Sequence, residues 1–167
     1  MLGSVVGMVD PASFEFIKEW TVRYVRHRDI AARKISGIRG TEYGFQVINK
    51  DGTLIECVVQ LALKKISGQF IAATKNALVI TLSNSENVQA VNRMWDALAA
   101  NSGLLVVFAN PFSALEDKWV LKPHLHNKVC DRNSLLQGLR AMSELVEPID
   151  EETLTMKLRN TRVAGKN

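Results

Sequence analysis

Residues 77–111 constrain the fold more than any other stretch of the sequence. They begin with the apolar run LVITL at 78–82 and close with LLVVFA at 104–109, and both runs predict buried strands. Between them, apolar residues recur at three- and four-residue steps, which predicts an amphipathic helix: Val88, Val91, Trp95 and Leu98. Two apolar strands joined by one helix form a parallel βαβ unit with a right-handed crossover.

The sequence before this unit predicts a helix and an antiparallel meander. Asp10-Pro11 suits the N-cap and first position of a helix, and residues 34–39 predict a short strand. Two longer apolar runs, 43–48 and 53–63, flank Lys50-Asp51-Gly52, and this pattern predicts a hairpin with a type I′ turn. The expected fold is therefore α/β, with three α/β/α layers and a mixed sheet in which the β-hairpin meander precedes the parallel βαβ unit.

The remaining segments carry weaker signals. Residues 63–76 predict a helix, 119–121 a short edge strand and 122–128 a loop. The inward face of a last helix is expected to consist of four apolar residues: Leu135, Leu139, Met142 and Val146. We expect a single α/β domain over 1–148, followed by a solvated and partly disordered basic tail over 149–167. The alternative for part of this tail is one pair of helical turns around Leu154 and Leu158.

Composition excludes several classes of protein. At 167 residues and 47% hydrophobic content, the chain is long enough to bury a full core. Its apolar runs are too short for a transmembrane helix, and its first residues lack the charged region and cleavage site of a signal peptide. Cys57 and Cys130 are poor material for a disulfide framework and suit a reducing, cytoplasmic location. The net charge of +4 favours contact with polyanions.

The order of elements suggests one catalytic hypothesis. A helix, a three-strand meander, a helix, a strand, a helix and a strand follow one another over roughly residues 12–110. This order resembles the restriction-endonuclease-like (PD-(D/E)XK) superfamily, which includes Holliday-junction resolvases and many DNA-cleaving enzymes. The resemblance implies an acidic residue on the second strand and a Glu-x-Lys pair on the third. Together these groups hold Mg²⁺ and activate a water for phosphodiester hydrolysis.

At the corresponding positions this chain has Gln46, Glu56 and Val58, so two of the three groups are missing. Lys64 is the candidate replacement for the lysine, and other nearby substitutes exist: Glu42, Asp51 and Lys65. The resemblance thus implies either a metal-dependent nuclease that uses Mg²⁺ or an inactive scaffold of the same shape that needs no cofactor. We favour the inactive scaffold, on which Glu56 is simply an exposed strand residue.

Basic residues are concentrated near the end of the first predicted helix: Arg23, Arg26, Arg28, Arg33 and Lys34. Cations at a helix C-terminus complement the helix dipole, which explains most of them without a ligand. The alternative is a patch that faces phosphates. Lys122 and Lys128 flank the predicted 122–128 loop, and the two groups would form a continuous basic strip for nucleic acid if they lie on one side of the sheet.

Polar residues at the ends of the two parallel strands form another candidate site. Ser83 and Asn84 follow the first strand and Asn110 follows the second, at the edge where α/β sheets bind ligands. Ser83 and Glu86 also have the spacing of a helix capping box, and Asn110 precedes a proline in a predicted turn. Capping and turn formation therefore explain the same residues without a ligand.

His124 and His126 form a candidate metal site. On an extended segment both imidazoles would point the same way, and Cys130 or Asp131 would complete a tetrahedral zinc site. The alternative is that they are polar loop residues beside Lys122 and Lys128.

Two classes of function follow from these patterns. One is a nucleic-acid-associated protein on a nuclease-like scaffold, catalytically degenerate. The other is a non-catalytic protein–protein interaction module that forms a homo-oligomer, such as a homodimer, through its apolar strands and Trp119. The sequence contains no nucleotide-binding glycine loop and no nucleophile elbow. Salt-dependent binding to short DNA and RNA distinguishes the two classes.

Overall fold

A computed structural model describes residues 9–65 and 74–165. Within these ranges six strands form one sheet in the order β1-β2-β3-β4-β5-β6. The strands are β1 Ile35–Thr41, β2 Gly44–Asn49, β3 Leu54–Val59, β4 Ala77–Leu82, β5 Leu104–Ala109 and β6 Lys118–Leu121. β3, β4 and β5 are parallel, and all other neighbours pair antiparallel. The predicted α/β fold with a mixed sheet is confirmed, including the hairpin arm beside β4.

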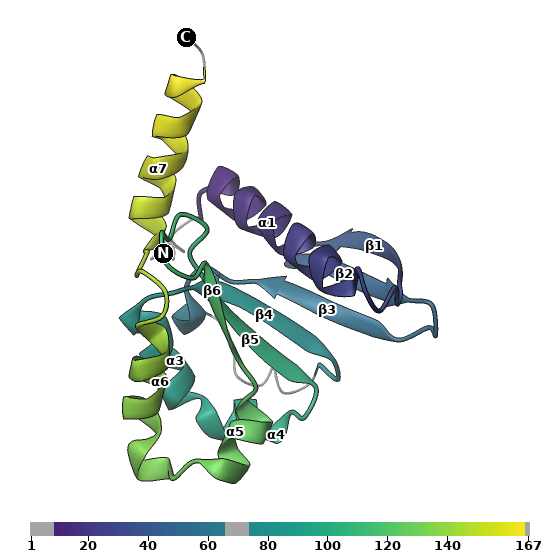
Figure 1. The fold of residues 1–167 in the computed structure, drawn as a ribbon, viewed down its shortest axis with the longest axis vertical. Coiled ribbons are helices and arrows are strands. Elements are labelled where there is room, and N and C mark those ends of the chain that lie inside the picture. The colour runs from purple at the N-terminus through teal and green to yellow at the C-terminus, as the bar shows by residue number, and fades with distance from the viewer. Residues whose placement is uncertain (1–8, 66–73, 166–167) are drawn as a thin grey trace, which may run out of the picture.

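Helices cover both faces of the sheet, which gives three layers (Figure 1). One face carries α1 Pro11–Asp29 and α7 Glu151–Ala164, and α7 extends beyond the body of the molecule. The other face carries α3 Ser85–Arg93, α4 Trp95–Ala100, α5 Pro123–Val129 and α6 Leu135–Ser143. Two 3₁₀ turns, η1 Leu63–Lys65 and η2 Arg132–Ser134, complete the elements of the described ranges. No helix in the described ranges is both long and apolar enough to cross a bilayer.

The core consists of two layers separated by the sheet. Towards α3–α6, Trp95 is buried and Phe108 stacks on Trp119 with ring centroids 4.0 Å apart. Towards α1, the core contains Ile17 and Phe45. Every residue of β4 is buried, because its side chains alternate between the two layers.

The βαβ unit is confirmed, but its helix begins and continues differently from the prediction. Ser83 is buried and extends the ladder, since its N–H donates to the Ala109 carbonyl (2.9 Å). The N-cap is Asn84, whose side chain accepts from the Asn87 N–H (3.0 Å), so the predicted Ser83–Glu86 capping box is wrong. The predicted single helix is also divided at Met94 into α3 and α4.

The Asp-Gly hairpin between β2 and β3 is confirmed, whereas its turn type is not. Gly52 has φ 84°, but Asp51 has a negative φ, which excludes a type I′ turn. The Gly52 N–H donates to the Asn49 carbonyl (3.0 Å), and the Thr53 N–H donates to the Asp51 carboxylate (2.8 Å). The Asp51 side chain therefore stabilises a turn in which only the glycine needs the left-handed region.

Three further predictions fail in the structure. The 122–128 segment is the helix α5, with Pro123 at its first position, instead of a loop. Met142 is exposed, while the other three predicted apolar residues of the last bundle helix are buried. Of the predicted 63–76 helix, residues 63–65 form the turn η1 and 74–76 are not helical, while 66–73 lie outside the described residues.

The predicted solvated tail is a helix over most of its length. Asp150 caps α7 by accepting from the Thr153 N–H (2.7 Å), and Leu154 is fully buried against the α1 layer. Ile149 is also buried, and its backbone forms hydrogen bonds to Ser83 and Asn84. The sequence signal was weak because α7 buries few of its residues.

Asn87 joins three segments at the carboxyl end of β4, and we expect loss of its side chain to destabilise the fold. Its Nδ2 donates to the carbonyls of Leu61 (2.9 Å) and Leu82 (2.8 Å), and its Oδ1 accepts from the Leu63 N–H (2.9 Å). Because Asn87 is buried, Asn87→Ala leaves these groups short of partners and should lower the free energy of unfolding by about 2–3 kcal/mol. Urea unfolding measures this loss. Gln89→Ala, at an exposed position of the same helix, should change stability by less than about 0.5 kcal/mol, and equal effects of both variants would contradict the assignment.

Candidate functional site

A groove, here called the basic groove, lies between the end of α1 and β1. It has a volume of about 560 Å³ and is lined by Arg26, Asp29, Ile30, Arg33, Ile35, Ser36, Gly37, Ile38 and Lys50. The chain turns sharply there because the Arg33 backbone occupies the left-handed region (φ 49°). The turn brings the β2–β3 hairpin to the helix end, and the Lys50 N–H donates to the Lys34 carbonyl (2.8 Å).

Asp29 organises the floor of the basic groove. Its carboxylate accepts from the N–H groups of Lys34 (2.8 Å) and Ile35 (3.0 Å). The Ile35 N–H, together with that of Lys34 and the charges of Lys50 and Lys34, lowers the pKa of Asp29. Asp29 is thus an anion that holds the backbone of the turn and partly offsets the charges of Lys34 and Lys50, although neither lysine lies within 4.0 Å of its carboxylate.

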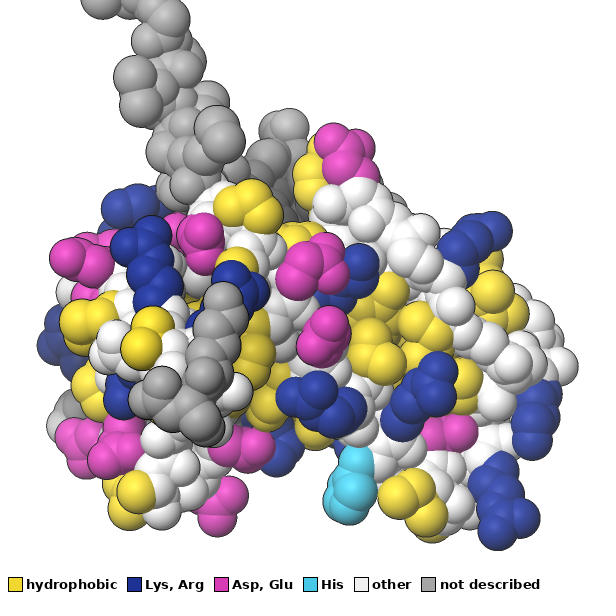
Figure 2. Space-filling view, turned by 90° about the horizontal axis from the view of Figure 1, so that it is seen from above, with side chains coloured by type: hydrophobic (Ala, Val, Ile, Leu, Met, Phe, Trp, Pro, Cys, Tyr) yellow, Lys and Arg dark blue, Asp and Glu magenta, His cyan; other side chains and the backbone are white. Residues whose placement is uncertain are grey.

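Four cations gather around this groove: Arg26, Arg33, Lys34 and Lys50. All four side chains are exposed, and none forms an ion pair within 4.0 Å among the residues that the structure describes. On the face in Figure 2, Lys and Arg side chains lie along the right-hand side, where α1 ends over the first strands, with few Asp or Glu side chains between them. Arg26 and Arg33 line the same groove and Lys34 follows Arg33, so the predicted basic positions 26, 33 and 34 lie together.

The other predicted basic residues lie elsewhere. Arg28 stacks over the Tyr24 ring (5.5 Å) and borders a different hollow, and Arg23 borders a shallow one beside Trp20. Lys122 precedes α5 and Lys128 lies in its last turn. Since α5 packs on α4, on the sheet face opposite α1, these lysines do not extend the α1 cations into the predicted strip.

The predicted catalytic residues divide into two places. Gln46 and Glu56 face each other across β2 and β3, and the Gln46 Nε2 donates to Glu56 Oε2 (3.1 Å). Arg39 on β1 donates to the Gln46 amide oxygen, so a polar row crosses three strands. Lys64 lies near the carboxyl end of β4 instead, where it pairs with Glu86 (3.5 Å).

This arrangement does not fit a Mg²⁺ site. Gln46 offers its amide nitrogen to Glu56 and its oxygen to Arg39, and Val58 is buried, so Glu56 is the single carboxylate of the row. In the parts of the chain that the structure describes, no group of three or more His, Cys, Asp or Glu side chains is placed to hold a metal ion. No step of catalysis is therefore assigned to a metal.

The polar residues at the strand ends bind the chain itself. The Asn84 Nδ2 donates to the Ile149 carbonyl (2.9 Å) and the Asn110 Nδ2 donates to the Glu147 carbonyl (2.8 Å). The Ser83 carbonyl accepts from the Ile149 N–H (2.8 Å). The segment before α7 thus packs against the edge at which the sequence predicts a candidate ligand site.

The two histidines are separated by the helix that contains them. Positions 124 and 126 of α5 point in widely different directions, since residues two apart do not share a helix face. The His124 Nδ1–H donates to the Ala99 carbonyl (2.8 Å), which fixes this ring against α4. The extended geometry on which the zinc hypothesis depended is absent.

Sequence reasoning missed three residues of these networks: Asp29, Arg39 and Lys50. Asp29 ends α1, and Lys50 begins the hairpin turn, so they are 21 positions apart in sequence order. The signal for Lys50 was its place beside Asp51-Gly52, but only the tertiary structure brings that turn to the helix end.

Cys57, which is fully buried on β3, provides a pH-dependent prediction. Burial, with a smaller effect of the Glu56 charge, raises its pKa from 9.0 to about 12. Between these pH values the unfolded chain has lost the thiol proton while the folded chain retains it, so stability falls as the pH rises. The expected loss is about 1.4 kcal/mol per pH unit above 9. Urea unfolding of the parent and of Cys57→Ala at pH 8 to 10.5 should show the parent's stability advantage shrinking with pH, and a constant difference would contradict the assignment.

Comparison of the chain with protein-family models, curated proteins and solved structures found no match. The resemblance to the restriction-endonuclease-like superfamily therefore stays a prediction, and the function proposed below is argued from the residues and their geometry.

Proposed function

We propose that this protein binds nucleic acid through the basic groove and does not cleave it. The observation that carries the proposal is the group of four exposed cations at the end of α1, with no ion-pair partner in the described residues. Asp29 offsets only part of this positive charge, and phosphate groups would supply the rest. The groove is open, and apart from Asp29, whose carboxylate accepts from the turn N–H groups, its other lining residues are small or apolar. This lining suits backbone contacts more than reading of base edges.

Local structure supports a phosphate-facing role over simple helix capping. The helix dipole acts within the last turn of α1, yet Arg33, Lys34 and Lys50 lie beyond it. Lys50 comes from the β2–β3 hairpin, so two separate elements direct cations to one groove. Clustering of like charges raises the free energy of the isolated protein, and an anionic partner removes that repulsion.

The non-catalytic part of the proposal rests on the polar row of Arg39, Gln46 and Glu56. Glu56 is held by an amide rather than by a second carboxylate, and its neighbour at position 58 is a buried valine. The candidate lysine Lys64 pairs with Glu86 near the carboxyl end of β4.

Neutralising two groove cations should weaken nucleic-acid binding and its salt dependence. The double variant carries Arg26→Gln and Lys50→Gln. Each phosphate contact that it loses should reduce the slope of the log binding constant against the log salt concentration by about 0.9 on duplex DNA. Fluorescence anisotropy of labelled 20-mer DNA and RNA over a series of salt concentrations measures both quantities. Because both side chains are exposed and unpaired, the melting temperature should stay nearly unchanged.

The matched control is Arg159→Gln with Arg162→Gln, which removes the same charge from the exposed side of α7. It should keep the parent's affinity and slope. Equal weakening by both double variants would indicate a mere net-charge effect, and absence of parental binding at low salt would overturn the proposal.

We expect no Mg²⁺-dependent cleavage of duplex, flap or junction DNA by the purified protein. One carboxylate without a lysine neither holds the metal nor activates the attacking water. Gel assays measure cleavage of each DNA by a 10-fold excess of protein over about an hour. Glu56→Gln is assayed in parallel as the matched variant. Cleavage by the parent that disappears in Glu56→Gln would show that the row is an active site.

Self-association is the second candidate function, because β1 is a free edge strand of seven residues. Trp119, which was considered for this role, is buried and stacked on Phe108 and so offers no exposed contact. Pairing through β1 would produce a dimer whose stability depends little on salt, whereas phosphate binding depends on it steeply.

A further inference from the structure

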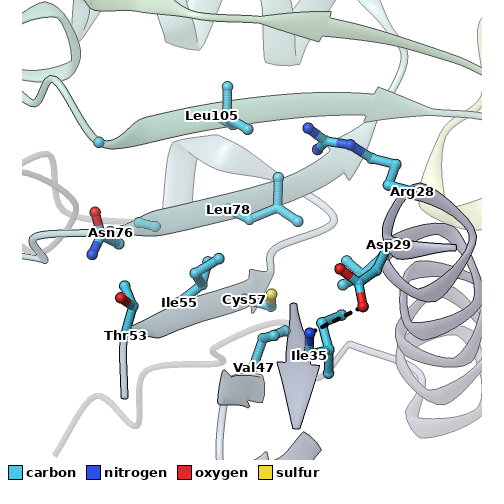
Figure 3. A pocket seen from close by; sticks show the side chains of 13 residues that line it. Arg28, Asp29, Ile35, Val47, Thr53, Ile55, Cys57, Asn76, Leu78 and Leu105 are labelled. Atoms are coloured by element: carbon cyan, nitrogen blue, oxygen red, sulfur yellow. Dashed lines mark hydrogen bonds between the residues drawn. The ribbon is translucent and has the colours of Figure 1, made fainter. Parts of the chain in front are cut away.

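A second hollow, here called the α1 cavity, lies between α1 and the amino ends of β3, β4 and β5 (Figure 3). Its volume is about 320 Å³. Most of its lining is apolar and comes from the helix, the hairpin and the central strands: Val25, Ile35, Val47, Ile55, Leu78 and Leu105. This size lies at the lower end of the range for small-molecule pockets.

Polar groups lie at two ends of the α1 cavity. In Figure 3 the Arg28 side chain extends from α1 over the strands towards Leu105, while Thr53 and Asn76 lie at the opposite end. Asp29 also borders the cavity, but its carboxylate is directed to the N–H groups of Ile35 and Lys34. Arg28 is therefore the charged group of the lining that is free to meet a ligand.

The Arg28 guanidinium is positioned but not neutralised. It lies over the Tyr24 ring, and one Nη1–H donates weakly to the Tyr24 hydroxyl (3.4 Å). A guanidinium has five N–H donors, so four remain for other partners. Among the described residues no carboxylate pairs with it. A single cation at one end of an apolar cavity has the chemistry to bind a carboxylate in bidentate fashion.

We propose that the α1 cavity binds a small amphipathic anion, with an apolar body and one carboxylate or sulfonate group. The body packs between α1 and the side chains of Ile55, Leu78 and Leu105, and the anionic group binds Arg28. This site is distinct from the basic groove, because Arg26 borders the groove and Arg28 borders the cavity. A nucleic-acid chain does not suit the cavity, since burying its charged backbone against apolar walls is costly.

The first test compares two ligands of equal length on the full chain. The fluorescent probe 1-anilinonaphthalene-8-sulfonate should bind saturably, and octanoate should displace it at least 10-fold more effectively than octan-1-ol, because only octanoate carries the anionic group. The variants described next show whether the probe binds in this cavity, so competition with nucleic acid is not needed as a further control.

Two pairs of variants locate the site. Arg28→Ala should remove the preference for octanoate over octan-1-ol, while Arg26→Ala, two positions away on the same helix, should retain it. Leu105→Phe adds volume inside the cavity and should weaken probe binding at least 10-fold. Val120→Phe, at a half-buried position on the same sheet face that does not line the cavity, should leave binding unchanged.

The proposal is overturned if the probe does not bind saturably, if octan-1-ol competes as well as octanoate, or if Arg28→Ala retains the preference. It is also overturned if Leu105→Phe, shown to be folded by its melting curve, binds the probe as the parent does. The ligand comparison on the parent alone decides the outcome should Leu105→Phe fail to fold.

Discussion

The rest of the structure depends on β4, a strand whose six residues are all buried. A strand without a solvent-facing side needs apolar cover above and below, so the chain must place helices on both faces of the sheet. The parallel neighbours β3 and β5 require crossover connections, and the connection from β4 to β5 supplies α3 and α4 on one face. The cover of the opposite face comes from α1 and, at the end of the chain, α7.

This arrangement determines where a ligand has room. In parallel α/β sheets the carboxyl ends of the strands usually form the ligand site. Here the side chains of Asn84 and Asn110 bind the backbone of residues 147–149, and Asn87 binds the chain that leaves β3. Buried amide groups need such partners, and the chain provides them internally. The basic groove and the α1 cavity lie instead near the end of α1, where the helix and the β1 turn diverge from the amino ends of the strands. A smaller hollow of about 260 Å³ remains beside Asn84 and Asn87.

Local patterns predicted the elements that are held by local or strongly apolar interactions. The 78–82 and 104–109 strands, the Asp-Gly hairpin and the start of α1 at Asp10-Pro11 all agree with the structure. Predictions failed where a distant contact decides the conformation. Residues 151–164 show little apolar periodicity, yet burial of Leu154 against the α1 layer makes them a helix. The 122–128 segment has a proline that fits equally a loop or a first helical turn, and contact with α4 selects the helix.

The cations of α1 and their helical spacing are visible in the sequence, but the two hollows that they border are not. Arg26 and Arg28 are two positions apart on α1, so their side chains point in different directions. Arg26 therefore borders the basic groove and Arg28 the α1 cavity, while Asp29 borders both. Lys50 lies beside the groove because the β2–β3 hairpin contacts the chain just after α1, and no local sequence pattern predicts this contact.

Salt should affect the two hollows differently, for a physical reason that follows from their surroundings. The cations of the basic groove are exposed, so mobile ions screen their field over about 8–10 Å at ordinary ionic strength. In the α1 cavity an anion beside Arg28 would be partly enclosed by apolar walls, where screening is weaker and a charge-assisted hydrogen bond is stronger. The Tyr24 ring beneath the guanidinium adds to this effect by holding Arg28 in place before a ligand arrives. One turn of α1 therefore supplies cations to two environments, one suited to a solvated polyanion and the other to a single anionic group.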